Sequence, residues 1–145
     1  MDDKEIVYPR RANIREEWHW VKQGVEEILH LDRNLTYRPE DVYASVLSGE
    51  SELWVHPNFF NVLTIQSDEF TGDKTLLLWI SWAKERGGAN AVTFAEFYEA
   101  LARHYGCRRI ETKSVQMPAV EYAQKEVGWT ISEITFGKDL HEDME

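Results

Sequence analysis

Three β-prone runs in quick succession constrain the fold more than any other feature of this sequence. Residues 51–57 (SELWVHP), 59–66 (FFNVLTIQ) and 74–83 (KTLLLWISWA) are separated by the turn-forming stretches HPN and SDEFTGD. Connections this short favour an antiparallel meander, because antiparallel neighbours can be joined by a tight turn. Residues 76–80 are almost continuously apolar, so we expect the third strand to be buried on both faces.

A long amphipathic helix is predicted ahead of the meander, over residues 13–32. Asn13 with Glu16 three residues later has the pattern of a capping box at its start. Its apolar residues recur at helical spacing and form one stripe: Ile14, Trp18, Val21, Val25, Ile28 and Leu29.

The rest of the chain alternates helical and strand patterns. A second helix is predicted over 38–50, where Pro39 suits the first turn and Gly49 the end. The whole order is β-α-α-β-β-β-α-β-α-β, which indicates an α/β protein. We expect a single domain spanning residues 1–145, with an acidic tail from about residue 138 to residue 145. The remaining expected elements are helices over 94–105 and 118–129 and strands over 6–8, 107–115 and 130–140.

Charge and composition exclude several classes of protein. The net charge of −10 opposes nucleic-acid binding, because each phosphate contact needs a cation. No apolar run reaches the length of a membrane span, and residues 1–11 lack a hydrophobic signal core. The single cysteine, Cys107, excludes a disulfide framework and a cysteine-based zinc site. We expect a soluble protein that is not secreted and binds neither nucleic acid nor membrane.

The order of elements resembles the GNAT (Gcn5-related N-acetyltransferase) fold over about residues 6–140. The most specific part is GCRRIETKS followed by a short helix and EVGWTISEITFGKDL. The resemblance implies a mixed, mostly antiparallel central sheet flanked by about four helices. It also implies acetyl-CoA as a cofactor, because GNAT enzymes hold its pyrophosphate on the backbone N–H groups of a Q/R-x-x-G-x-G/A loop that opens a helix.

The loop that matches this motif departs from it. Ala89 stands where the family has glycine, and its methyl group crowds a backbone that must approach a ligand closely. Thr93 and Glu96 form a capping-box pattern, which would occupy donors that a pyrophosphate needs. We therefore expect a degenerate cofactor loop, with a working acetyl-CoA cradle as the alternative. The loop consists of Arg86, Gly87, Gly88, Ala89, Asn90 and Ala91.

The catalytic groups that the resemblance implies are incomplete. Many GNAT enzymes have a tyrosine that acts as the general acid four residues before a Gly-aromatic pair, and here that position is Gln124. Tyr122 lies roughly 200° around the helix from it. If the chain is an enzyme, its candidate groups are Tyr122 and the carboxylates Glu52 and Glu85, with His56 as a further possible base. No histidine pattern of a metal site is present.

The six tryptophans indicate either an unusually large aromatic core or aromatic surface that is exposed. Trp18 and Trp20 lie on different faces of one helix, so we expect that they cannot share a core. Trp79 and Trp82 lie three apart on one strand, so we expect them on opposite faces of the sheet. Exposed tryptophan is enriched at protein interfaces, and Trp20 and Trp82 are therefore the predicted interface residues.

Two functional hypotheses follow. The stretches PEDVYASVLSGESELWV and LLLWISWA, with the GCRRIE-to-GW ending, resemble small GNAT-like proteins encoded among tailed-phage virion and DNA-ejection genes. That resemblance implies a non-catalytic virion or assembly component with protein partners, located in the host cytoplasm, the virion or both. The alternative is an acetyl-CoA-dependent N-acetyltransferase acting on a cationic amine, which an acidic surface would attract.

Overall fold

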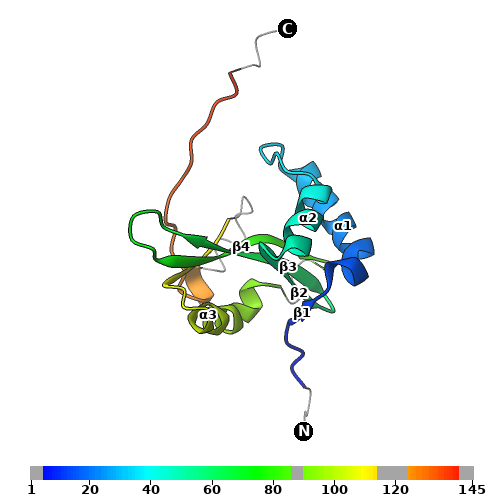
Figure 1. Cartoon of the computed structure of the whole chain (residues 1–145), viewed down its shortest axis with the longest axis horizontal. Coiled ribbons are helices and arrows are strands. Elements are labelled where there is room, and N and C mark those ends of the chain that lie inside the picture. The colour runs from blue at the N-terminus through cyan, green and yellow to red at the C-terminus, as the bar shows by residue number, and fades with distance from the viewer. Residues whose placement is uncertain (1–4, 86–89, 114–123, 141–145) are drawn as a thin grey trace.

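The computed structural model describes residues 5–85, 90–113 and 124–140. Five strands form one sheet in the order β1-β2-β3-β4-β5, in which β1 to β4 are antiparallel neighbours and β5 is parallel to β4 (Figure 1). The predicted mixed, mostly antiparallel sheet is thereby confirmed. The strands are β1 (Arg10–Ala12), β2 (Ser51–His56), β3 (Phe59–Ser67), β4 (Lys74–Ala83) and β5 (Arg109–Thr112).

Helices cover both faces of this sheet. The helices α1 (Ile14–Leu31) and α2 (Pro39–Ser48) lie on one face, and α3 (Ala95–His104), which follows the 3₁₀ turn η1 (Val92–Phe94), lies on the other (Figure 1). Local signals set the ends of the first two helices, because the Asn13 side chain accepts a hydrogen bond from the Arg15 N–H and Gly49 ends α2 with a φ of 88°. None of the described helices is long and apolar enough to cross a membrane.

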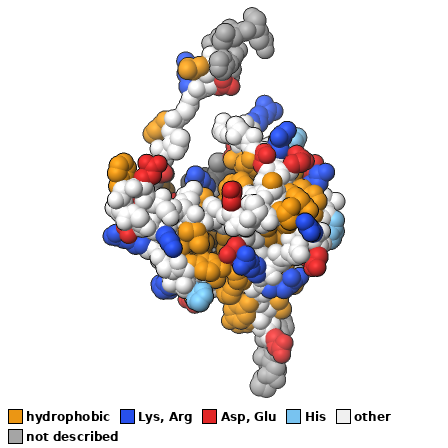
Figure 2. Space-filling view, in the orientation of Figure 1, with side chains coloured by type: hydrophobic (Ala, Val, Ile, Leu, Met, Phe, Trp, Pro, Cys, Tyr) orange, Lys and Arg blue, Asp and Glu red, His pale blue; other side chains and the backbone are white. Residues whose placement is uncertain are grey.

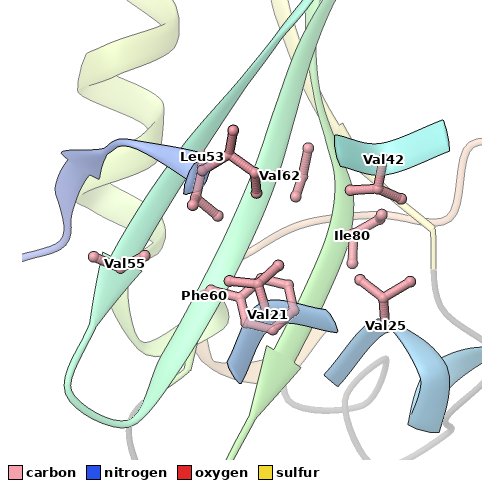
Figure 3. Packing of buried hydrophobic residues seen from close by; sticks show 9 residues of the cluster. Val21, Val25, Val42, Leu53, Val55, Phe60, Val62 and Ile80 are labelled. Atoms are coloured by element: carbon pink, nitrogen blue, oxygen red, sulfur yellow. The ribbon is translucent and has the colours of Figure 1, made fainter. Parts of the chain in front are cut away.

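Two hydrophobic cores lie on opposite faces of the sheet. The first, called the α1–α2 core, is drawn in Figure 3 and joins the two N-terminal helices to β2, β3 and β4. Its buried residues are Ile14, Val21, Val25, Val42, Leu53, Val55, Phe60, Val62 and Ile80. The second, called the α3 core, has as its buried residues Leu63, Leu76, Leu78, Ala91, Tyr98 and Ala102.

A β-bulge in β4 lets this strand contribute to both cores. Val62 of β3 pairs with Ile80, whereas the next residue, Leu63, pairs with Leu78, so Trp79 is the extra residue. Leu78 belongs to the α3 core, while the consecutive residues Trp79 and Ile80 both contact the α1–α2 core. The expectation that β4 is buried on both faces is confirmed.

The bulge overturns one expectation about the tryptophans, and packing overturns another. Trp79 and Trp82 pack against the same core, because the extra residue shifts the alternation of side chains. Trp18 and Trp20 also pack against that core, contrary to expectation. They reach different neighbours: the ring of Trp18 contacts Tyr43 of α2, and that of Trp20 contacts Phe60 of β3.

The first strand lies later in the chain than predicted. Residues 6–8 form no strand, and β1 begins at Arg10, beyond Pro9. Proline has no N–H to donate to a sheet, which favours pairing on its C-terminal side. Tyr8 instead packs its ring against Phe94 and Phe97 at the start of α3, with centroids 5.9 Å apart in each pair.

The predicted final strand is not formed. Residues 130–139 have no regular secondary structure, and the segment leads away from the body of the molecule (Figure 1). Strand-like alternation gives a segment the ability to pair, but this segment pairs with no other described strand. Of the helix predicted over 118–129, residues 124–126 are helical and 118–123 lie outside the described residues.

The packing of α1 on the sheet predicts the effect of one substitution. A Cβ at Gly24 would lie 2.5 Å from Cε2 of Phe60 and 2.8 Å from Cδ2 of Trp82. We expect Gly24→Ala to lower the free energy of unfolding by about 1–3 kcal/mol, because overpacking outweighs the better helix propensity of alanine. Urea unfolding measures this, with the exposed Gln23→Ala as control. Equal or greater stability of Gly24→Ala would contradict the close contact.

Candidate functional site

The second half of β4 has a strand on one side only. Pairing with β5 runs from Thr75–Arg109 to Leu78–Thr112 and stops there. Among the described strands, residues 79–83 therefore have β3 as their single neighbour. This open edge begins at the bulge and leads into the segment before α3, which is where the sequence predicts a cofactor loop.

Asn90 organises the start of α3. Its side-chain Oδ1 accepts hydrogen bonds from the Val92 N–H at 2.9 Å and the Thr93 N–H at 3.3 Å. In return, the Thr93 hydroxyl accepts from the Asn90 N–H at 2.9 Å and donates to the Asn90 carbonyl at 2.7 Å. The two residues thus form a reciprocal cap one turn ahead of the helix.

The next two amides are engaged as well. The Phe94 N–H donates to the carbonyl of Ala91 at 3.2 Å, and the Ala95 N–H donates to the carbonyl of Val92. The predicted capping box of Thr93 and Glu96 is therefore wrong, since Phe94 is the residue that caps α3 and no side chain bonds there. Two possible caps overlap at this turn. In the structure the Asn90 side chain accepts the hydrogen bonds, and residues 92–94 have a 3₁₀ conformation.

The predicted loop falls only partly within the described residues. Arg86, Gly87, Gly88 and Ala89 lie outside them, as does Tyr122. Asn90 is half-buried, and Ala91 is buried in the α3 core. These last two residues therefore have structural roles, in capping and in packing, that the motif comparison did not predict.

Glu52 is held by three neighbours. Its carboxylate accepts from the Tyr105 hydroxyl at 2.8 Å and from the Trp54 indole N–H at 3.0 Å, and it forms an ion pair with Arg11 at 3.7 Å. Burial, followed by the hydrogen bond to Glu52, raises the pKa of Tyr105 to about 12. The network ties α3 to β1 and β2, so Glu52 has a structural role in the described conformation.

Among the described residues, no contact joins the other candidate groups, or Gln124 at the family's tyrosine position, to Glu52. Glu85 is exposed just beyond β4, and Gln124 is exposed in the short helical stretch 124–126. Burial lowers the pKa of His56, whose Nδ1 accepts from the Asn58 N–H at 3.0 Å. The structure does not bring these groups together with Glu52 into one site.

A buried polar chain beneath α3 was not predicted from the sequence. The Tyr98 hydroxyl donates to Asn61 Oδ1 at 2.5 Å, and the Asn61 amide donates to the Ser81 hydroxyl at 2.7 Å. Tyr98 and Asn61 are both fully buried, and burial raises the pKa of Tyr98. The one signal was a lone asparagine in the apolar run FFNVL, since a buried amide needs partners.

Trp20 and Trp82 form a half-buried aromatic pair near the end of β4. Their ring centroids lie 6.3 Å apart, and both rings also contact Phe60. The Trp82 indole N–H donates to Glu27 at 3.2 Å, and the Lys84 ammonium lies 4.8 Å from the centroid of the Trp20 ring. Most of this pair serves packing, and its remaining surface lies beside the segment that leads to the predicted loop.

The described part of the chain has no cluster of side chains suited to binding a metal ion. There, no group of three or more histidine, cysteine or acidic side chains is arranged to hold an ion. Burial raises the pKa of Cys107, which disfavours the reactive thiolate.

Comparisons with known proteins place the fold. No family model matches the sequence, and no curated protein is similar enough in sequence to count as a relative. The structure is similar to that of the BH1408 protein of Bacillus halodurans (a tetramutant), with a TM-score of 0.70 at 14% identity, covering 92% of this chain and 99% of that one. The chain has a GNAT-like fold.

Several of the similar structures are described as acetyltransferases. Glucosamine-6-phosphate N-acetyltransferase of Arabidopsis thaliana has a TM-score of 0.63 at 14% identity, covering 94% of this chain and 99% of that one. An acetyltransferase of Trypanosoma brucei has a TM-score of 0.61 at 14% identity, covering 93% and 100%. At this identity the likeness concerns the GNAT-like fold alone.

The cap at Asn90 predicts a measurable loss of stability. We expect Asn90→Ala to lower the free energy of unfolding by about 1 kcal/mol, because the N–H groups of Val92 and Thr93 lose their acceptor. Asn90→Asp is the matched control, since a carboxylate oxygen also accepts both bonds and favours the start of a helix. Urea unfolding of the three proteins provides the test. Equal stability of Asn90→Ala and the parent would contradict the assigned cap.

Proposed function

We propose that this chain is a GNAT-fold protein that does not catalyse acetyl transfer and acts through contacts with protein partners. The observation that carries the proposal is the reciprocal cap of Asn90 and Thr93. A GNAT-type cofactor site needs backbone N–H groups that point at the pyrophosphate. Here the N–H groups of Val92 and Thr93 are bonded to the Asn90 side chain, and those of the next two residues to backbone carbonyls.

The candidate catalytic groups support the same proposal. Gln124 stands at the position of the family's tyrosine acid, and an amide cannot donate a proton to a leaving thiolate. The carboxylate of Glu52 is committed to Tyr105, Trp54 and Arg11, so using it as a base would break contacts between α3 and the sheet.

The biological setting rests on sequence resemblance. The likeness of residues 39–55, 76–83 and 106–129 to small tailed-phage proteins supports a role in virion structure, assembly or DNA ejection. The net charge of −10 favours a protein partner over a nucleic acid. The half-buried pair Trp20 and Trp82 is the candidate contact surface, because such rings bury much area on binding at low cost in side-chain entropy.

The second candidate is an acetyl-CoA-dependent N-acetyltransferase, and one observation favours it. The fold matches acetyltransferases along nearly the whole chain, and the open edge of β4 leads toward the predicted loop. In this case the acidic surface would attract cationic amines such as polyamines, aminoglycosides or lysine-rich peptides.

Cofactor binding separates the two candidates. We expect acetyl-CoA at about 1 mM to leave the melting temperature unchanged and to give no saturable heat in calorimetry, because the described N–H groups of residues 92–95 are already bonded within the chain. Pyrophosphate at matched ionic strength controls for general anion effects. Saturable stabilisation that grows with the logarithm of acetyl-CoA concentration would overturn the non-catalytic proposal, and a thiol-release assay with cationic amines would then test the second candidate.

A further inference from the structure

A hollow opens to solvent between α1 and α2, in the helical layer on one face of the sheet. Its volume is about 300 Å³, which is at the lower end of the range for pockets that bind small molecules. All of its lining residues come from these two helices, so it is distinct from the open edge of β4. We call it the α1–α2 hollow, and it is lined by Trp18, Lys22, Glu40 and Tyr43.

Each helix contributes one aromatic ring and one charged group to the hollow. On α1, Trp18 and Lys22 lie four residues apart. On α2, Glu40 and Tyr43 lie three residues apart. Residues three or four apart share one face of a helix, so the ring and the charge of each helix lie side by side. The two charges that line the hollow are opposite in sign.

The two rings form a corner that suits a positively charged group. The ring of Trp18 meets that of Tyr43 edge to face, with centroids 5.0 Å apart and planes inclined at 66°. Both residues are half-buried, so part of each ring stays accessible. Figure 2 shows hydrophobic side chains over α1 and α2, with acidic and basic side chains around them. Aromatic faces attract cations, and the attraction grows where water is partly excluded.

The two charged groups of the hollow have no partner within the part of the chain that the structure describes. There, the side chains of Lys22 and Glu40 form neither an ion pair nor a hydrogen bond, with each other or with another residue. Both are exposed and therefore hydrated. A ligand that carries a cation and an anion would satisfy both groups, whereas a singly charged ligand is attracted by one and repelled by the other.

We propose that the α1–α2 hollow binds a small zwitterion that carries a methylated ammonium group and a carboxylate. The ammonium group lies against the two rings with Glu40 as its counter-ion, and the carboxylate pairs with Lys22. Methylated ammonium groups are the cations that aromatic cages recognise. A zwitterion adds no net charge, so the net charge of −10 does not oppose its approach, as it would oppose that of an anion.

Binding at this hollow would link two helices that pack on the α1–α2 core. Ion pairs at exposed groups contribute little free energy, so we expect a dissociation constant in the millimolar range. A ligand that bridges α1 and α2 stabilises the folded chain by mass action. The inference goes beyond the proposed contacts with protein partners and does not depend on whether the chain binds acetyl-CoA.

Titration of the ¹⁵N-labelled chain with two betaines tests the proposal. The probes are glycine betaine and γ-butyrobetaine, in which the charges lie further apart. We expect at least one of them to cause saturable shifts of the Trp18 indole N–H and of the amides of residues 40–43. Two matched probes each lack one charge: tert-butylacetate has carbon in place of the betaine nitrogen, and choline has a hydroxyl group in place of the carboxylate. Each should bind about tenfold more weakly, because it loses one of the two charge contacts.

Neutral variants test the two charged groups separately. Glu40→Gln should weaken binding of the betaine about tenfold and remove its preference over tert-butylacetate. Lys22→Gln should weaken it to a similar degree and remove its preference over choline. The matched controls Glu50→Gln and Arg33→Gln each remove an exposed charge of the same sign outside the hollow and should leave the affinity unchanged. Equal melting temperatures of the free variants would show that they fold.

Three results would overturn the proposal. One is the absence of saturable shifts with either betaine, which is expected if Lys22 and Glu40 pair directly in solution and close the hollow. Another is equal affinity for the betaine and for both singly charged probes, which would show that the methyl groups alone are bound. The third is an affinity for the betaine that neither neutral variant changes.

Discussion

The structure depends on one strand that is buried on both faces. β4 supplies Leu76 and Leu78 to the α3 core and Ile80 to the α1–α2 core, so both layers of helix are held to the sheet through it. The bulge at Trp79 makes this possible, because one extra residue changes which face the following side chains meet. The same residue marks where pairing with β5 ends. The position of the bulge therefore coincides both with the change of core along β4 and with the end of its pairing with β5.

The start of α3 determines what that site can do. An open edge on β4 that leads to a helix N-terminus has the geometry of an anion-binding site. Within the described residues, the side chains of Asn90 and Thr93 accept hydrogen bonds from the N–H groups of Asn90, Val92 and Thr93. A fold shared with acetyltransferases does not by itself establish their activity, since activity resides in the donors and acids that the fold carries.

Local signals made much of the fold predictable. The meander, the start of α1 at Asn13 and the end of α2 at Gly49 follow from residues close together in sequence. The bulge could not be predicted from local sequence, because it arises from the register in which β3 pairs with β4. The final strand was predicted for a related reason, since its alternating pattern is local, whereas pairing with another described strand is not, and none forms.

The sequence predicted a cofactor loop before α3 but not the hydrogen bonds that form at the start of that helix. The prediction of the loop rested on its position after the third strand of the meander. Two capping patterns overlap there, and the structure forms the hydrogen bonds of Asn90 rather than a capping box of Thr93 and Glu96. The role of Glu52 as a partner of Tyr105 depends on the packing of α3 on β2, which no local pattern contains.

Backbone amide exchange at residues 92 and 93 tests the central claim most directly. In a ¹⁵N-labelled sample, the N–H groups of Val92 and Thr93 should exchange slowly with solvent, and their resonances should not move when acetyl-CoA is added. Rapid exchange at both positions, with shifts that saturate as acetyl-CoA is titrated, would show that the donors are available to a pyrophosphate and would contradict the account.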